Sequence, residues 1–167
     1  MIGSRFGYYA SQKAAAPSLL LDLYPATAAY SLIKLRTAYS GSAIRVRRSS
    51  DSAEQDIGFD SNGELDTVSL LSFVGAGDGF VTTWYDQQGS NNILQTSASR
   101  QPRIVNAGIV ELLNGKPAIY SNGSNALSTT STSVNVVGSN GVQSVFAAAQ
   151  INSGNSILCS YIDGGDN

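Results

Sequence analysis

The sequence predicts a mostly β domain, a sandwich of antiparallel strands with two short helices. Short β-prone runs recur at intervals of roughly 8–12 residues and are separated by Gly, Asn, Asp and Ser, a pattern typical of sandwiches. Hydrophobic residues make up 42% of the 167-residue chain, enough for a core, while charged residues make up only 13%. This length and composition suit a single globular domain.

The strands are predicted from β-propensity and from alternation of apolar and polar residues. Residues 80–85 are the strongest candidate, because they are β-branched or aromatic throughout and lie between Gly79 and Gly89. Residues 44–47 alternate with a period of two, which indicates a half-buried strand. Further short strands are expected at residues 93–96, 103–105, 109–113, 118–120, 126–128, 143–149 and 156–161.

Two helices and one hairpin complete the predicted elements. Thr27 is a candidate N-cap for a helix over residues 27–39, where apolar side chains recur at helical spacing. Asp66 is a candidate N-cap for a second, short helix that Gly75 would end. Residues 49–63 are polar and rich in turn-forming types, which predicts a hairpin.

The chain divides into a lead-in, residues 1–26, and the sandwich domain, residues 27–167. The lead-in is apolar, with Phe6 and Tyr8 among its aromatics, but has no clear period. We therefore expect it to contact another chain, in a homo-oligomer or a larger assembly. Residues 145–159 predict a hairpin in the middle of a sheet close to the end of the sequence, so the fold is expected to be incomplete at its C-terminus.

Composition excludes several classes of function. The chain has no histidine, which rules out Ser-His-Asp and Cys-His catalysis and histidine-ligated zinc, and Cys159 is its single cysteine. A net charge of −2 gives no basis for binding nucleic acid. The apolar run at Leu19 to Leu21 is interrupted by Asp22, so we expect no secretory segment and no membrane insertion. No cofactor is predicted.

Two basic or aromatic motifs each allow two interpretations. The arginines at 45, 47 and 48 could bind phosphate or an acidic glycan, but acidic residues follow within a dozen positions, and internal pairing is the favoured interpretation. Trp84, Tyr85 and Asp86 could form a platform for stacking a sugar ring. The favoured interpretation is that Trp84 belongs to the core, since it ends the strongest predicted strand.

Acidic residues are the remaining candidates for chemistry. Some lie in Gly- and Asn-rich loops that could bind calcium through oxygen ligands, although no spacing matches an EF-hand: Asp78, Asp86, Asp163 and Asp166. A glycosidase needs two carboxylates that flank the scissile bond, and the sequence alone nominates no such pair. We therefore predict no metal site and no catalytic residue, and name Asp86, Asn91 and Asn92 as candidates for ligand binding.

An ordered set of motifs resembles the N-terminal half of the α-L-arabinofuranosidase B catalytic-domain family over roughly residues 27–162. The motifs are AYSL from position 29, RVRRSSD from 45, DIG from 56, LD from 65, WYDQQG from 84, QPRI from 101 and NGKPA from 114. The resemblance implies a concanavalin A-like β-sandwich of jelly-roll character. It also implies that the catalytic glutamate and aspartate of the enzymes align after Asn167, and that Leu158-Cys159 stands where the enzymes have adjacent cysteines.

The same signature is similar to lectin-like modules of bacteriophage virion proteins. On this basis the chain is predicted not to be an enzyme but a structural or attachment domain of a phage tail, fibre or capsid surface. Its partners would then be other virion subunits and a host surface glycan, and its location the virion. The alternatives are a fragment of an arabinofuranosidase-like glycoside hydrolase and a purely structural scaffold without a ligand.

Overall fold

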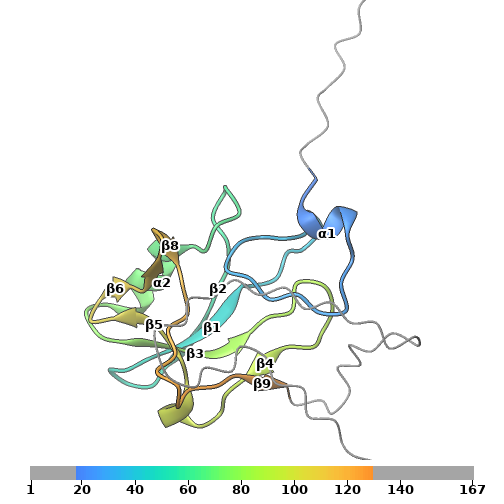
Figure 1. The fold of residues 1–167 in the computed structure, drawn as a ribbon. Coiled ribbons are helices and arrows are strands. Elements are labelled where there is room, and N and C mark those ends of the chain that lie inside the picture. Colours follow the sequence, from blue (N-terminus) through green and yellow to red (C-terminus); the bar gives the residue numbers. More distant parts are fainter. Residues whose placement is uncertain (1–17, 130–167) are drawn as a thin grey trace, which may run out of the picture.

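The computed structural model describes residues 18–129, which form one antiparallel seven-stranded sheet, a two-stranded sheet and two short helices (Figure 1). The predicted mostly β fold class is confirmed. Along the main sheet the order is β2-β1-β3-β4-β9. In addition, β5 pairs with β3, and β6 pairs with β5. The strands of this sheet are β1 (Ile44–Arg48), β2 (Glu54–Ile57), β3 (Gly79–Trp84), β4 (Ile93–Leu94), β5 (Arg103–Asn106), β6 (Ile109–Val110) and β9 (Ser128–Thr129).

The remaining elements are small. The second sheet pairs β7 (Leu112–Leu113) with β8 (Lys116–Pro117), and the single turn η1 spans Ala98–Arg100. Helix α2 (Thr67–Val74) begins after Asp66, whose carboxylate accepts a hydrogen bond from the Ser69 N–H at 2.9 Å, and it ends at Gly75 as predicted. None of the helices within residues 18–129 is long and apolar enough to cross a membrane.

The core lies on one face of the main sheet. Alternation along β1 puts Ile44 and Val46 on this face, fully buried, and Arg45 and Arg47 on the opposite face. Helix α2 lies on the core face, and its buried residues join those of the strands in one cluster: Ala43, Ile44, Val46, Ile57, Leu65, Leu70, Val74, Val81, Ile104 and Val105. The two faces of the sheet therefore differ sharply in polarity.

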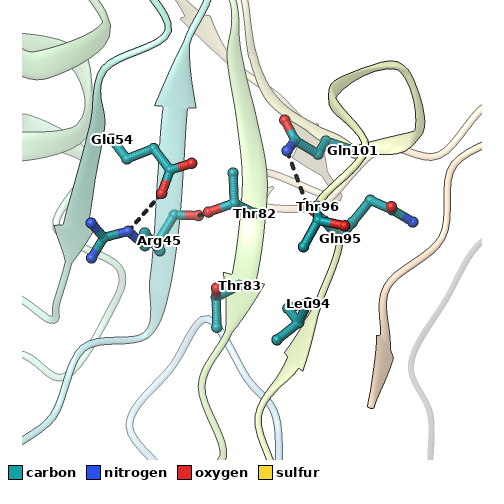
Figure 2. Close-up of a pocket in the computed structure, with 8 residues that line it drawn as sticks. All are labelled: Arg45, Glu54, Thr82, Thr83, Leu94, Gln95, Thr96 and Gln101. Atoms are coloured by element: carbon teal, nitrogen blue, oxygen red, sulfur yellow. Dashed lines mark hydrogen bonds and ion pairs between the residues drawn. The ribbon is translucent and has the colours of Figure 1, made fainter. Parts of the chain in front are cut away.

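A β-bulge interrupts the pairing of β1 with β3. Arg45 lies opposite Thr83 and Val46 opposite Val81, so Thr82 is the extra residue. The bulge lets the side chains of Thr82 and Thr83 both line the arginine-bearing face of the sheet (Figure 2).

The helix predicted over residues 27–39 is wrong. This segment has no regular structure apart from an isolated bridge between Ile33 and Glu64. Its backbone groups bond to other parts of the chain instead: the Lys34 N–H donates to the Gly63 carbonyl at 2.7 Å, and the Leu35 N–H to the Gln87 side chain at 2.8 Å. The first helix, α1, lies earlier and spans only Leu20–Leu23.

Most strand predictions within the described residues hold in position, with shifted ends. Residues 44–47, 80–85 and 103–105 correspond to β1, β3 and β5. The run at 109–113 is split into β6 and β7, and the run at 118–120 is reduced to a bridge between Arg103 and Tyr120. The predicted strands at 143–149 and 156–161 lie outside the described residues.

Candidate functional site

The loop that follows β3 brings together the three residues predicted to bind a ligand. Asp86 is only 2% exposed, and its carboxylate accepts hydrogen bonds from the N–H groups of Ala29 and Gln88, each at 2.9 Å, and of Asn91 at 3.2 Å. The Asn92 side chain in turn accepts from the Asp86 N–H at 3.0 Å. The carboxylate of Asp86 thus holds the loop together from inside, and a ligand-binding role for these residues stays a prediction.

Gln87, the next residue, connects the same loop to the irregular segment before β1. Its side chain is 1% exposed and accepts from the Leu35 N–H at 2.8 Å. It also donates to the carbonyls of Ser31 at 3.1 Å and Ile33 at 2.9 Å. A buried amide with three such partners is fully satisfied, so this glutamine fixes the segment in place.

Trp84 has the structural role that was predicted, although it is half-buried and not fully buried. It packs against the core cluster, and its ring centroid lies 6.2 Å from that of Tyr30. Burial, and secondarily the charge of Asp86, raises the pKa of the Tyr30 phenol to about 12. The two rings thus form an aromatic pair next to the loop that follows β3.

The opposite face of the sheet carries a network of charged side chains. Arg45 donates to Glu54 at 2.7 Å and to Asp56 at 3.1 Å, and the Tyr85 hydroxyl donates to Asp56 at 2.7 Å. Glu54 and Asp56 are two positions apart on β2, so both point to this face. Burial and the bond to Asp56 raise the pKa of Tyr85, while its contact with Arg45 opposes that shift.

The other two arginines are also engaged within the chain. The favoured interpretation of internal pairing is confirmed for Arg45 and Arg48, whereas Arg47 has an amide partner. Arg48 pairs with Asp51 at 2.6 Å, which lowers the pKa of that carboxyl. Arg47 donates to the side chain of Gln101 at 2.7 Å and lies 4.9 Å from the ring centroid of Phe80.

Beside this network the polar face is hollowed into a groove of about 370 Å³, shown in Figure 2. We call it the sheet groove. It lies between the Arg45–Glu54 pair on one side and the segment that runs from β4 to Gln101 on the other. Its lining side chains come from five separate stretches of the sequence: Arg45, Glu54, Thr82, Thr83, Leu94, Gln95, Thr96 and Gln101.

The two calcium candidates within the described residues, Asp78 and Asp86, have separate structural roles. Asp78 accepts from the Ala107 N–H at 2.7 Å, and Asp86 holds its own loop, while Asp163 and Asp166 lie outside the described residues. Within residues 18–129 there is no group of three or more Cys, Asp or Glu side chains that could hold a metal ion.

Comparison with known protein families decides the identity of the domain. The model of the catalytic domain of α-L-arabinofuranosidase B matches residues 22–156. The chain belongs to this family. The resemblance inferred from the motifs is thereby confirmed, and membership of the arabinofuranosidase B catalytic-domain family agrees with the predicted β-sandwich class.

Solved structures of the family are similar to this chain over a limited part. One is a GH54 α-L-arabinofuranosidase soaked with a cyclic sulfate inhibitor, with 28% identity over 42% of this chain and a TM-score of 0.39. Another is an arabinofuranosidase complexed with arabinofuranosyl-α-1,2-xylobiose, also with 28% identity, at a TM-score of 0.40. The match covers 15% of the length of each of those chains. No curated protein matches the sequence.

These findings correct two sequence-based expectations. The prediction that the chain is not an enzyme is wrong, because the family that it belongs to is a family of arabinofuranosidase catalytic domains. The family match likewise favours the alternative, part of an arabinofuranosidase-like hydrolase, over the predicted virion protein.

Sequence reasoning did not find the sheet groove. The alternation in residues 44–47 does indicate that Arg45 and Arg47 share a face, and that signal was available. The bulge at Thr82 and the approach of Gln101 to Arg47, 54 positions away, leave no local pattern in the sequence.

Proposed function

We propose that this chain forms the N-terminal part of an α-L-arabinofuranosidase catalytic domain, and that the protein carrying it releases arabinofuranosyl groups from glycans. The family match over residues 22–156 carries the proposal. Because the match covers only 15% of the length of the matched enzymes, the activity is assigned to the whole natural protein.

Three carboxylates of the described residues have structural roles and not catalytic ones. Glu54 and Asp56 share one guanidinium, and Asp86 is enclosed by backbone N–H donors. Neither arrangement leaves two carboxyl groups free on either side of a glycosidic bond, as hydrolysis requires. We therefore assign no catalytic role to these three residues, and propose that the catalytic acid and its partner carboxylate lie elsewhere in the natural protein, supported by the main sheet.

The test is hydrolysis of 4-nitrophenyl α-L-arabinofuranoside by the natural gene product, with 4-nitrophenyl β-D-xylopyranoside as the comparison substrate. We expect release of nitrophenol from the arabinofuranoside in clear excess over the xyloside. A mock purification controls for contaminating hydrolases. Folded protein that releases no more nitrophenol than the mock sample contradicts the proposal.

A further inference from the structure

We propose that the sheet groove is a binding site for a neutral oligosaccharide. Through this site the protein would contact its glycan substrate at a distance from the bond that is cleaved. The class of sugar is inferred from the proposed function. The presence of a binding site is inferred from the groove itself. The volume of about 370 Å³ falls within the range of small-ligand sites, on the order of 300–1,000 Å³.

The charge of the groove favours an uncharged ligand. Its two charged lining residues, Arg45 and Glu54, form an ion pair at 2.7 Å, and Arg45 has a second carboxylate partner in Asp56. An anionic ligand would have to displace these carboxylates from Arg45, and a cationic ligand would have to compete with the guanidinium. A polyhydroxylated sugar can bond to both partners without separating them.

The amide side chains of the groove are held in fixed positions. Gln101 is 4% exposed, accepts from Arg47 at 2.7 Å and donates to the Gln95 carbonyl at 3.0 Å. The Gln95 side chain donates to the Ala126 carbonyl at 2.7 Å and accepts from the Ser97 N–H at 3.0 Å. Because these side chains are already ordered, binding would cost little further conformational entropy there.

The groups that remain for a ligand are hydroxyls and one apolar surface. The hydroxyls of Thr83 and Thr96 make no hydrogen bond within the described part of the chain, and each can both donate and accept. Leu94, from the same wall, provides an apolar surface for the C–H groups of a sugar ring. Paired donors and acceptors beside an apolar surface match the alternating hydroxyl and C–H groups of an oligosaccharide.

A second hollow on the protein serves as an internal control. It has about 430 Å³ and is lined by Arg48, Gln55, Val68, Ser69, Ser72 and Phe73. Its arginine is bonded to Asp51 and to the Phe73 carbonyl, and its one amide side chain, Gln55, makes no hydrogen bond within the described part of the chain. Ser72 is exposed on α2, so Ser72→Ala changes that hollow and leaves the sheet groove intact.

The experiment is a titration of the full 167-residue chain with arabinotriose and, separately, with xylotriose, followed by amide chemical shifts. We expect shifts at Thr83, Leu94 and Thr96 with at least one of the two sugars. Thr83→Val and Thr96→Val keep the shape of the side chain and remove the hydroxyl. Each variant should raise the Kd by about twofold to tenfold, the range for the loss of one hydrogen bond. Ser72→Ala should leave the Kd unchanged.

Three results would overturn the inference: no shifts in the folded parent chain, shifts confined to the Ser72 hollow, or an unchanged Kd in both valine variants. The sugar that binds distinguishes an arabinan from a xylan main chain. Hydrolysis of the nitrophenyl arabinofuranoside without shifts at the groove refutes only the groove. Binding at the groove without hydrolysis by the natural protein refutes only the proposed function.

Discussion

The carboxylate of Asp86 accepts a hydrogen bond from the N–H of Ala29 at 2.9 Å, across 57 positions of sequence. This bond joins the loop after the central strand β3 to the irregular segment that precedes β1. The neighbouring Gln87 N–H donates to the Ala29 carbonyl at 2.8 Å, so both backbone groups of Ala29 are engaged by consecutive residues of one loop.

Replacing Asp86 should therefore destabilise the domain strongly. In Asp86→Ala the N–H groups of Ala29, Gln88 and Asn91 lose their acceptor. Hydrogen bonds to charged groups contribute about 1.5–3 kcal/mol each and are not additive, so we expect a loss of at least about 3 kcal/mol in the free energy of unfolding. Urea denaturation followed by circular dichroism measures it.

Glu54→Gln is the control for that variant. Glu54 is on the exposed edge strand β2 and makes a single ion pair, with Arg45. Exposed pairs of this kind contribute up to about 1 kcal/mol. If Asp86→Ala and Glu54→Gln shift the denaturation midpoint equally, the structural role given to Asp86 is wrong.

Two glycines should respond to alanine in opposite ways. A Cβ at Gly79 would lie 3.0 Å from Cγ2 of Val74 and 3.2 Å from Cγ1 of Val46, between the helix and the sheet, whereas a Cβ at Gly58 would meet no atom within 4 Å. Gly79→Ala should cost about 1–3 kcal/mol through overpacking. Gly58→Ala should be neutral or stabilising by up to about 1 kcal/mol. Thermal unfolding of the two variants in parallel decides the matter, and equal melting temperatures would show that the packing around Gly79 adjusts freely.

Trp84 should tolerate phenylalanine far better than alanine. Its indole N–H is buried and has no hydrogen-bond partner within residues 18–129, so Trp84→Phe removes an unsatisfied donor and keeps an aromatic ring against Tyr30. We expect a cost below about 1.5 kcal/mol for phenylalanine and about 3 kcal/mol for alanine, measured by denaturant unfolding. A phenylalanine variant as unstable as the alanine variant would reveal that the indole N–H has a partner after all.

The raised pKa of Tyr30 makes stability fall in alkaline solution. An exposed tyrosine loses its proton near pH 10.0, while burial and the Asp86 charge raise the pKa of Tyr30 to about 12. The favourable contribution is complete below pH 10 and is lost between pH 10 and about 12, because only the unfolded chain releases this proton in that window.

Tyr30→Phe should therefore flatten the decline of the unfolding midpoint between pH 10 and about 12. It should also remove one late-titrating phenolate from the absorbance of the folded protein. The slope is reduced and not abolished, since burial also raises the pKa of Tyr39 and Tyr85. An identical pH profile in parent and variant would contradict the assignment.

Local patterns predicted the elements that local interactions stabilise. Helix α2 was found from Asp66 and Gly75 because a cap acts within one turn. The helix expected over residues 27–39 is absent because its backbone bonds to other parts of the chain, above all to the Gln87 side chain, which lies more than 50 positions away. The sequence of residues 27–39 contains no signal that the buried Gln87 amide donates hydrogen bonds to carbonyl groups of this segment.

The candidate site divides in the same way. Asp86, Asn91 and Asn92 were selected from one short loop, and the structure does place them together. The sheet groove depends on pairing between β1, β3 and β4 and on a bulge, none of which can be read from any single stretch. Charge compensation around Arg45 could be anticipated, because its partners Glu54 and Asp56 lie close to it in the sequence. The shape of the groove beside Arg45 could not be anticipated, because it depends on distant pairing.

Within residues 18–129, strand β2 lies at one edge of the main sheet and presents Glu54, Gln55 and Asp56 to solvent. A strand at the edge of a sheet has backbone groups that invite pairing with a second copy, and charged side chains in that position oppose such association. We therefore expect that removing the charges of Glu54 and Asp56 lowers the solubility at high concentration more than it lowers the melting temperature. The carboxylates oppose association between copies, whereas the buried face of the sheet contributes most of the stability.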